Sequence, residues 1–326
     1  MSEPKHASCC QLGETLGISH DSANRFLLRE HYEPSDLYAE ALRVVKPVGG
    51  TLSVDDTVLD KPYASKMAYV GYFWSGKHHK TVKGINLITL YYADNQGQRA
   101  PVNYRLYDKT EGKTKNDYFL EMLAEVLAWG LKPAYVTADS WYACISNLKT
   151  VKEHGMAWLM AIESNRIVSV EKGCWTQVQQ LDIPPEGRIV WLKAFGQVKL
   201  FRTTLKDQMR HYLTYLPKED DYDSFQREHF QHLHDQHWQI EQYHRVIKQV
   251  CNIERFQVRT HTAITNHIFA ALCSFVQLQR MTATDLISNA YCWKRELYRE
   301  IVANFTKDFA LSLPHLNTQF IGCVNA

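Results

Sequence analysis

The stretch His234-Asp-Gln-His237-Trp-Gln-Ile-Glu241-Gln-Tyr-His-Arg245-Val-Ile-Lys248 has the periodicity of an amphipathic helix, which flanking residues extend to about His229–Val258. At about 100° per residue, the residues that lie within about 40° of Glu241 are His234, His237, Arg245 and Lys248. The opposite side is a core-facing stripe of Ile240, Tyr243, Val246, Ile247 and Val250. The polar face is either a solvated surface with a Glu–Arg pair at i,i+4 or a functional surface. Motifs elsewhere in the chain are needed to distinguish these two interpretations.

Composition and charge restrict the class of protein. The chain has 326 residues, 45% hydrophobic and 22% charged, which fits one large or two ordinary globular domains. The net charge of +2 means that an anionic partner must be met by local cationic patches. Eight cysteines without a CxxC pair argue against a zinc ribbon or a disulfide scaffold and fit a reducing compartment. With no apolar leader and no membrane span in the sequence, we expect a cytoplasmic protein without a membrane partner.

Residues 1–47 have the pattern of a helix-turn-helix followed by a connecting helix. Ala7–Leu16 is the first predicted helix, Gly17-Ile18-Ser19 the turn, and the second helix runs through Leu28. Ordinary helical hairpins share this pattern, and residues 1–50 hold five Lys and Arg against seven Asp and Glu. Arg25 on the second helix is the candidate DNA contact. The connecting helix from Tyr32 ends near the Pro47-Val-Gly-Gly50 boundary.

Residues 48–164 predict the first part of an α/β domain. The predicted strands are Thr51–Thr57, Ile85–Tyr92, Ala100–Tyr107, Pro133–Ser140 and Met156–Ile162, and the predicted helices are 114–130 and Trp141–His154. This order favours a mixed sheet with helices over a purely parallel one. Carboxylates come at the ends of two of these strands, at Asp55 and Asp56 and at Asp139.

Residues 165–225 change character and predict a β-rich insertion. The expected strands are Arg166–Val170, Arg188–Ala194, Gln197–Leu205 and Arg210–Leu216. Residues 226–282 return to helices, namely the helix that carries Glu241 and a further one over Thr260–Arg280. Residues 283–326 are expected to be a C-terminal helical tail.

Asp55, Asp139 and Glu241 together predict a metal site. Carboxylate oxygens are the ligands that Mg²⁺ prefers, and two ions about 4 Å apart can activate a water for phosphodiester chemistry. A single strand-end Asp is more often a turn or cap residue, so the signal is the combination. Asp55 and Asp56 point to opposite faces of their strand by its period of two.

Three motifs carry a resemblance to a known family. Asp55-x-Thr57, Tyr135-Val-Thr-Ala-Asp139-Ser-Trp-Tyr and Glu241-x6-Lys248 resemble the DDE transposases of bacterial insertion sequences, in the branch with a β-rich insertion between the second Asp and the Glu. The resemblance covers about residues 50–282. Its Asp-x-Thr pattern selects Asp55 over Asp56. In the family signature Tyr-x2-Arg-x3-Glu-x6-Lys, His234 and His237 take the Tyr and Arg positions.

The resemblance implies a ribonuclease-H-like fold and metal-dependent strand cleavage at transposon ends, followed by strand transfer into target DNA. It implies that Asp55, Asp139 and Glu241 are the catalytic ligands of two Mg²⁺ ions, with Mn²⁺ as a plausible substitute. The implied partners are double-stranded DNA and a second copy of the chain, in a homodimer or a larger synaptic complex. Lys248 is the implied phosphate contact.

Further candidates and alternatives remain open. Arg245 and His237 join Lys248 as possible DNA contacts along the Glu241 helix. Histidines 229, 232, 234 and 237 lack a matching cysteine or second pair, which disfavours zinc. Trp175 and Trp191 could stack an unpaired base or pack in the core. The alternative functions are a ribonuclease-H-fold nuclease without strand transfer and a catalytically inactive helix-turn-helix DNA-binding regulator.

Overall fold

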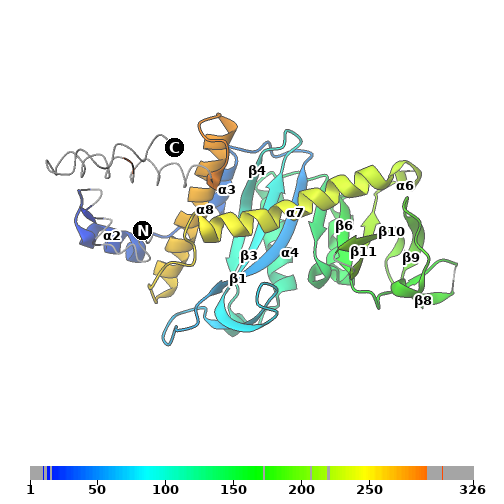
Figure 1. The fold of residues 1–326 in the computed structure, drawn as a ribbon, viewed down its shortest axis with the longest axis horizontal. Helices are drawn as coiled ribbons and strands as arrows, with labels where there is room; N and C mark the ends of the chain where they lie inside the picture. Colours follow the sequence, from blue (N-terminus) through cyan, green and yellow to red (C-terminus); the bar gives the residue numbers. More distant parts are fainter. Residues whose placement is uncertain are drawn as a thin grey trace, which may run out of the picture.

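The protein is an α/β structure built on one mixed sheet of eleven strands (Figure 1). The computed structural model describes residues 10, 13–14, 17–171, 173–205, 208–218, 221–291 and 303. Helices cover both faces of one half of the sheet, and one long helix continues from that half over the strands of the other (Figure 1).

The half of the sheet that carries the predicted aspartates is formed by β1 (Thr51–Asp60), β2 (Gly71–Ser75), β3 (Lys80–Ala93), β4 (Arg99–Leu106), β5 (Tyr135–Ala138) and β6 (Ala157–Ile162). Strand β3 runs antiparallel to β1 and β4, whereas β5 is parallel to both β1 and β6. The order β4-β3-β1-β5-β6 confirms the predicted ribonuclease-H-like mixed sheet. The sequence analysis did not predict β2, which pairs with the first residues of β3.

The β-rich region contains β7 (Ile167–Ser169), β8 (Trp175–Gln177), β9 (Arg188–Leu192), β10 (Gly196–Leu205) and β11 (Gln208–Tyr215). These strands do not form a separate layer. Strand β11 pairs antiparallel with β6, from His211 opposite Ile162 to Tyr215 opposite Trp158. The Thr214 hydroxyl adds a hydrogen bond of 2.8 Å to the Trp158 carbonyl. The region that we expected as an insertion therefore continues the same hydrogen-bonded sheet.

Helix α7 (Arg227–Gln249) crosses one face of the sheet over β1 and β5, and α4 (Lys115–Ala128) and α5 (Ile145–Glu153) lie on the other face (Figure 1). On the α7 face, Tyr91 of β3 stacks on Tyr243 with ring centroids 4.9 Å apart. Helices α3 (Pro34–Ala41) and α8 (His261–Ala283) cover β4 at the end of the sheet. The core-facing stripe predicted for the Glu241 helix is thus confirmed at Ile240, Tyr243 and Ile247, which are buried.

Several boundaries differ from the predictions, among them those of the Glu241 helix, of β1 and of the connecting helix. Helix α7 ends at Gln249 and not near Val258, because Asn252 adopts a left-handed conformation (φ 57°) and the Ile253 N–H bonds back to the Ile247 carbonyl. Strand β1 continues to Asp60 because residues 55–60 keep antiparallel partners in β3. The connecting helix from Tyr32 is reduced to α3.

The N-terminal helix-turn-helix is only partly within the described residues. Helix α2 (His20–Arg29) begins with Ser19 as its cap, after Gly17 in a left-handed conformation (φ 66°). The predicted first helix, Ala7–Leu16, lies mostly outside the described residues, as does most of the tail 283–326, so both stay predictions. Helix α2 is held to α8 by the Asn266 amide, which donates to the carbonyls of Leu27 and Glu30. Among the helices that the structure describes, none combines the length and apolar character needed to cross a bilayer.

Candidate active site

The two adjacent aspartates of β1 point to opposite faces of the sheet and have different surroundings. On the α4 face, the Asp56 carboxylate accepts hydrogen bonds from Asn86 (2.6 Å), Lys115 (2.7 Å) and Tyr142 (3.2 Å). On the α7 face, the Asp55 carboxylate accepts the Asp56 backbone N–H (2.7 Å). Asp56 is therefore tied into the protein by a cation and two neutral donors, whereas Asp55 faces the helix that carries Glu241.

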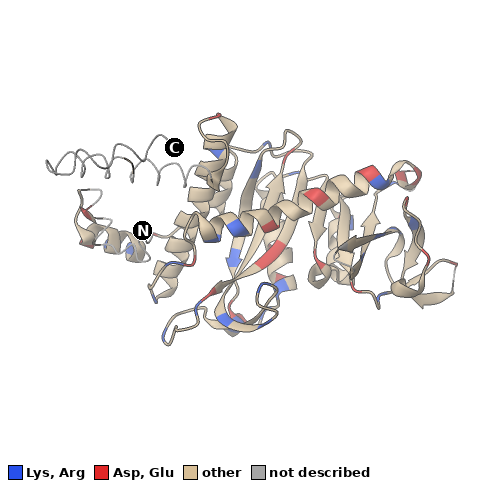
Figure 2. Ribbon diagram, viewed as in Figure 1, with Lys and Arg blue, Asp and Glu red and all other residues tan. Residues whose placement is uncertain are grey.

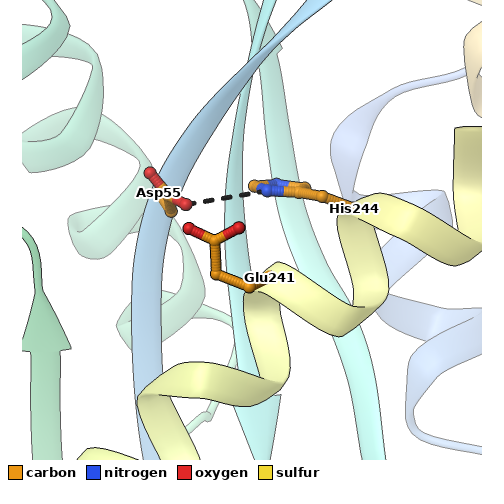
Figure 3. A group of neighbouring side chains, drawn as sticks. All are labelled: Asp55, Glu241 and His244. Carbon is orange, nitrogen blue, oxygen red and sulfur yellow. Dashed lines mark ion pairs between the residues drawn. The ribbon is translucent and has the colours of Figure 1, made fainter. Parts of the chain in front are cut away.

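Helix α7 brings Glu241 and His244 to Asp55 (Figure 3). One oxygen of Asp55, one oxygen of Glu241 and one ring nitrogen of His244 all lie within 4.8 Å of one another. Glu241 is exposed, and His244, three residues later on the same face of the helix, is buried. Acidic segments of β1 and α7 lie close together where the helix crosses the strand (Figure 2). Two carboxylates and an imidazole at this spacing could hold a divalent cation.

Asp139 lies directly after β5, next to Asp55 in the sheet. In the parallel pair of β1 and β5, Val54 is opposite Ala138, so the next residues along the two chains are Asp55 and Asp139. The Asp139 carboxylate accepts the Trp141 N–H (3.0 Å) and caps the short 3-10 helix Ser140–Tyr142. Asp139 does not belong to the group of Asp55, Glu241 and His244 that lies within 4.8 Å, among the residues that the structure describes.

Burial and neighbouring carboxylates raise the pKa values of Asp55 and Asp139. Burial, followed by the charges of Asp139, Asp56 and Glu241, raises the pKa of Asp55 well above its usual value. Burial, followed by the charge of Asp56, raises the pKa of Asp139 to about 6. Negative charges collected in a partly buried place favour the binding of a proton or of a cation.

A chain of hydrogen bonds runs beneath α7. The Ser53 and Thr137 hydroxyls lie 2.7 Å apart, and the Thr137 hydroxyl lies 3.2 Å from Nδ1 of His237. Burial, followed by the charge of His234, lowers the pKa of His237 to about 4, so its ring is neutral at pH 7. His234 is also bonded, through Nε2 to the Tyr212 hydroxyl (3.2 Å). The two histidines that replace Tyr and Arg of the family signature are thus bonded to the sheet.

The predicted DNA contacts occupy different settings. Lys248 Nζ donates to the Val58 carbonyl (2.7 Å) and lies 3.3 Å from a Glu254 oxygen, so its charge is already paired within the protein. Arg245 is exposed, with its guanidinium 5.7 Å from the centre of the Trp238 ring. Arg25 is exposed on α2, which packs on α8, and the structure does not bring it to the carboxylates.

Sequence reasoning missed His244 and the partners of Asp56. His244 could have been found from its spacing, since a residue three positions after Glu241 lies about 60° from it on a helix. The partners Asn86, Lys115 and Tyr142 come from three separate elements and leave no local pattern. Trp175 and Trp191 are 46% and 41% exposed, so neither ring is fully packed in the core. Both lie opposite Ser169, on the two strands that flank β7.

A mixed sheet of this strand order, with aspartates on β1 and after β5 under a helix that carries a glutamate, defines a ribonuclease-H-like α/β protein. The chain belongs to the transposase DDE domain family, which it matches over residues 47–276. The family assignment confirms the resemblance of the three motifs to DDE transposases.

The solved structures similar to this chain include two of low similarity. A chain of the Drosophila P element transposase strand transfer complex is 12% identical with a TM-score of 0.24, over 43% of this chain and 30% of that chain. The chain thus spans less than a third of that relative. The NurA nuclease from Sulfolobus solfataricus is 10% identical with a TM-score of 0.25, over 67% of this chain and 84% of that chain. No curated protein matches the sequence.

Proposed function

We propose that this protein is a DNA transposase that cuts DNA strands at the ends of a mobile element and joins them to target DNA. The observation that carries the proposal is the meeting of Asp55 and Glu241, 186 residues apart in sequence, within 4.8 Å of each other. Asp139 supports it by its place beside Asp55 in the sheet. Membership of the transposase DDE domain family supports the choice of DNA as the substrate.

The proposed reaction has two steps on phosphodiesters. In the first, a water oxygen attacks the phosphorus and the bond to the 3′ oxygen breaks, which leaves a free 3′-hydroxyl. In the second, that 3′ oxygen attacks a target phosphorus and the target strand's own 3′ oxygen leaves. Two divalent ions, Mg²⁺ or Mn²⁺ in its place, would activate the nucleophile and stabilise the leaving oxygen when bound by Asp55, Asp139 and Glu241.

The protein's own groups would position the DNA. Arg245 is one helical turn beyond Glu241 and exposed, so it is a proposed phosphate contact. Lys248 can contact a phosphate by exchanging its ion pair with Glu254. His237, bonded to Thr137 through Nδ1, would act through its other ring nitrogen, and Arg25 would contact DNA from α2.

The proposal also covers the assembly and its place in the cell. Two transposon ends must be brought together for joining, so we propose a homodimer or larger complex on double-stranded DNA in the bacterial cytoplasm.

Glu241→Gln tests the proposal. Gln keeps the shape of the side chain but removes the charge, so the variant should lose metal-dependent cleavage of duplexes that carry the element's ends while still binding them. Glu228→Gln, in the exposed first turn of the same helix, is the matched control and should cleave like the wild type. Metal-dependent cleavage retained by Glu241→Gln would overturn the assignment.

The products separate the two alternatives. Joined products with a short duplication of target sequence identify a transposase, whereas cleavage without joining identifies a nuclease. Tight specific binding by a wild-type protein that does not cleave identifies an inactive DNA-binding regulator.

A further inference from the structure

We propose that His244 is a third protein ligand of the ion that Asp55 and Glu241 hold, and that this position therefore prefers a first-row transition metal ion such as Mn²⁺ to Mg²⁺. The inference rests on the proposed function only in assuming that a divalent ion binds here. It concerns a residue that none of the three family motifs includes.

The positions of the three side chains fit a common ion. Metal–ligand bonds of about 2.1 Å allow two ligands of one ion to lie at most about 4.2 Å apart. One atom each of Asp55, Glu241 and His244 lies within 4.8 Å of the other two, so shifts of less than about 1 Å at each atom would bring all three to one ion. Figure 3 shows the imidazole ring and both carboxylates converging from β1 and α7.

The His244 ring is buried, but it makes no hydrogen bond to the rest of the described protein, which leaves it available to bind an ion. The residue is 6% exposed, and its Nε2 has no hydrogen-bond partner among the described residues. Its Nδ1 is 3.6 Å from an Asp55 oxygen, which is too long for a hydrogen bond. Neither ring nitrogen thus has a hydrogen-bond partner among the described residues, which is costly for a buried side chain. Nδ1, which faces the Asp55 carboxylate, is the nitrogen that an ion shared with Asp55 would bind.

Two other histidines of the same helix show the contrast. His234 bonds to the Tyr212 hydroxyl and His237 to the Thr137 hydroxyl, both at 3.2 Å. Each of these two histidines thus has one ring nitrogen bonded to a hydroxyl of the sheet, whereas His244 has neither bonded to a described residue. His244 faces a carboxylate pair, where a cation would give its ring nitrogen a partner.

The mixed ligand set determines the preference for metal. Mg²⁺ takes oxygen ligands almost exclusively, whereas imidazole nitrogen binds first-row transition ions more tightly. A site with two carboxylates and one imidazole should therefore bind Mn²⁺ in preference to Mg²⁺, while a site of carboxylates alone discriminates less.

Pulsed electron paramagnetic resonance of the full-length protein loaded with Mn²⁺ tests the proposal directly. Coupling between the Mn²⁺ electron spin and an imidazole ¹⁴N nucleus is expected in the wild type and in His232→Gln, an exposed control on the same helix. It should be lost in His244→Gln, which offers an oxygen in place of the ring nitrogen. In titrations without DNA, His244→Gln should bind Mn²⁺ about tenfold or more weakly, with Mg²⁺ affinity changed by less than about threefold.

Several results would overturn the assignment. They are no ¹⁴N coupling in the wild type, coupling that persists in a folded His244→Gln protein, or coupling that disappears in His237→Gln but not in His244→Gln. Circular dichroism checks the fold, and His244→Asn provides a smaller replacement if Gln is not accommodated; the wild-type spectrum decides even if neither variant folds. A wild type that shows the coupling but cleaves no DNA would support the role of His244 and overturn the transposase proposal, so the two failures are distinct.

Discussion

Asp55 and Asp56 show how one residue type gains two roles from strand geometry. Successive residues of β1 point to opposite faces, so Asp55 meets Glu241 and His244, and Asp56 meets Lys115. Asp55 has like charges around it and Asp56 has a cation, so the same carboxylate destabilises the metal-free fold at one position and stabilises it at the next.

Asparagine at each position should therefore change stability in opposite directions. Asp56→Asn should lower the free energy of unfolding by about 1–3 kcal/mol, because Lys115 loses its charged partner in a partly buried place. Asp55→Asn should leave the metal-free protein at least as stable as the wild type while it abolishes cleavage. Urea unfolding in EDTA at pH 7 measures both, and equal destabilisation by the two changes would contradict this difference between the two aspartates.

The pKa of Asp139 predicts a dependence of stability on pH. Its value rises from 3.8 to about 6 on folding, so between these values the folded protein binds more protons than the unfolded chain. The contribution of Asp139 to stability therefore becomes less favourable as the pH rises from about 4 to 6. Above pH 6 the unfavourable contribution is complete, at most about 3 kcal/mol and less for a carboxylate that keeps some hydration.

Asp139→Asn removes this titration. In EDTA, the variant should gain stability relative to the wild type as the pH is raised from 4.5 to 7, and added Mn²⁺ should reduce the difference by stabilising only the wild type. Urea unfolding at the two pH values provides the measurement. A difference between variant and wild type that does not change with pH would exclude Asp139 as the titrating group.

The candidate site could be predicted from sequence where one strand or helix determined it. The period of two separates Asp55 from Asp56, and the helical period places His237 and Glu241 on one face. The bonding of His234 and His237 to hydroxyls on β11 and β5 could not be predicted, because the partners are 22 and 100 residues away.

At the scale of the element, α7 shows that a periodic pattern predicts the buried face of a helix better than it predicts where the helix ends. The pattern of apolar residues continues past Gln249, but the chain turns there. Lys61, at the end of β1, donates to the carbonyls of Glu254 and Phe256 at 2.5 and 2.9 Å and holds the segment after the helix against the sheet. That contact joins residues nearly 200 positions apart, so no local pattern in the sequence contains it.

Arg245 and Lys248, both on the last two turns of α7, should respond differently to loss of charge. Arg245→Met should weaken DNA binding and lower the slope of log affinity against log salt by about 1, with little effect on stability, because the side chain is exposed. Lys248→Met should destabilise the fold, since Glu254 and the Val58 carbonyl lose their partner.

Salt-dependent binding titrations and thermal unfolding of both variants test this difference. A destabilised Arg245→Met protein, or a Lys248→Met protein of wild-type stability, would reverse the roles of the two cations.

At the scale of the whole molecule, the order of strands was predictable in the first half of the sheet and not in the second. Hydrophobic alternation predicted most strands of the β-rich region, but it does not indicate which strands pair with each other in the sheet. The pairing of β11 with β6 joins residues about 50 apart and makes one sheet of what looked like two units.

Hydrogen exchange can test this continuity. If β11 extends the sheet, its central amides should exchange with protection within about 1 kcal/mol of those of β6, because one cooperative opening exposes both. Amides of β11 that exchange much faster than those of β6, in the same protein without metal, would mean that the β-rich region unfolds by itself.

The continuous pairing of strands also fixes the distance across the sheet from β1 to β8. From β1 to β8 there are seven strand-to-strand steps, and at about 4.8 Å each they measure roughly 34 Å, or somewhat less once the sheet twists. One turn of duplex DNA has nearly the same length, about 34–36 Å. Trp175 on β8 is therefore about one duplex turn from Asp55, whereas Trp191 on β9 is five steps, or roughly 24 Å, away. A duplex that contacts the protein at both Asp55 and Trp175 would be held over about one helical turn.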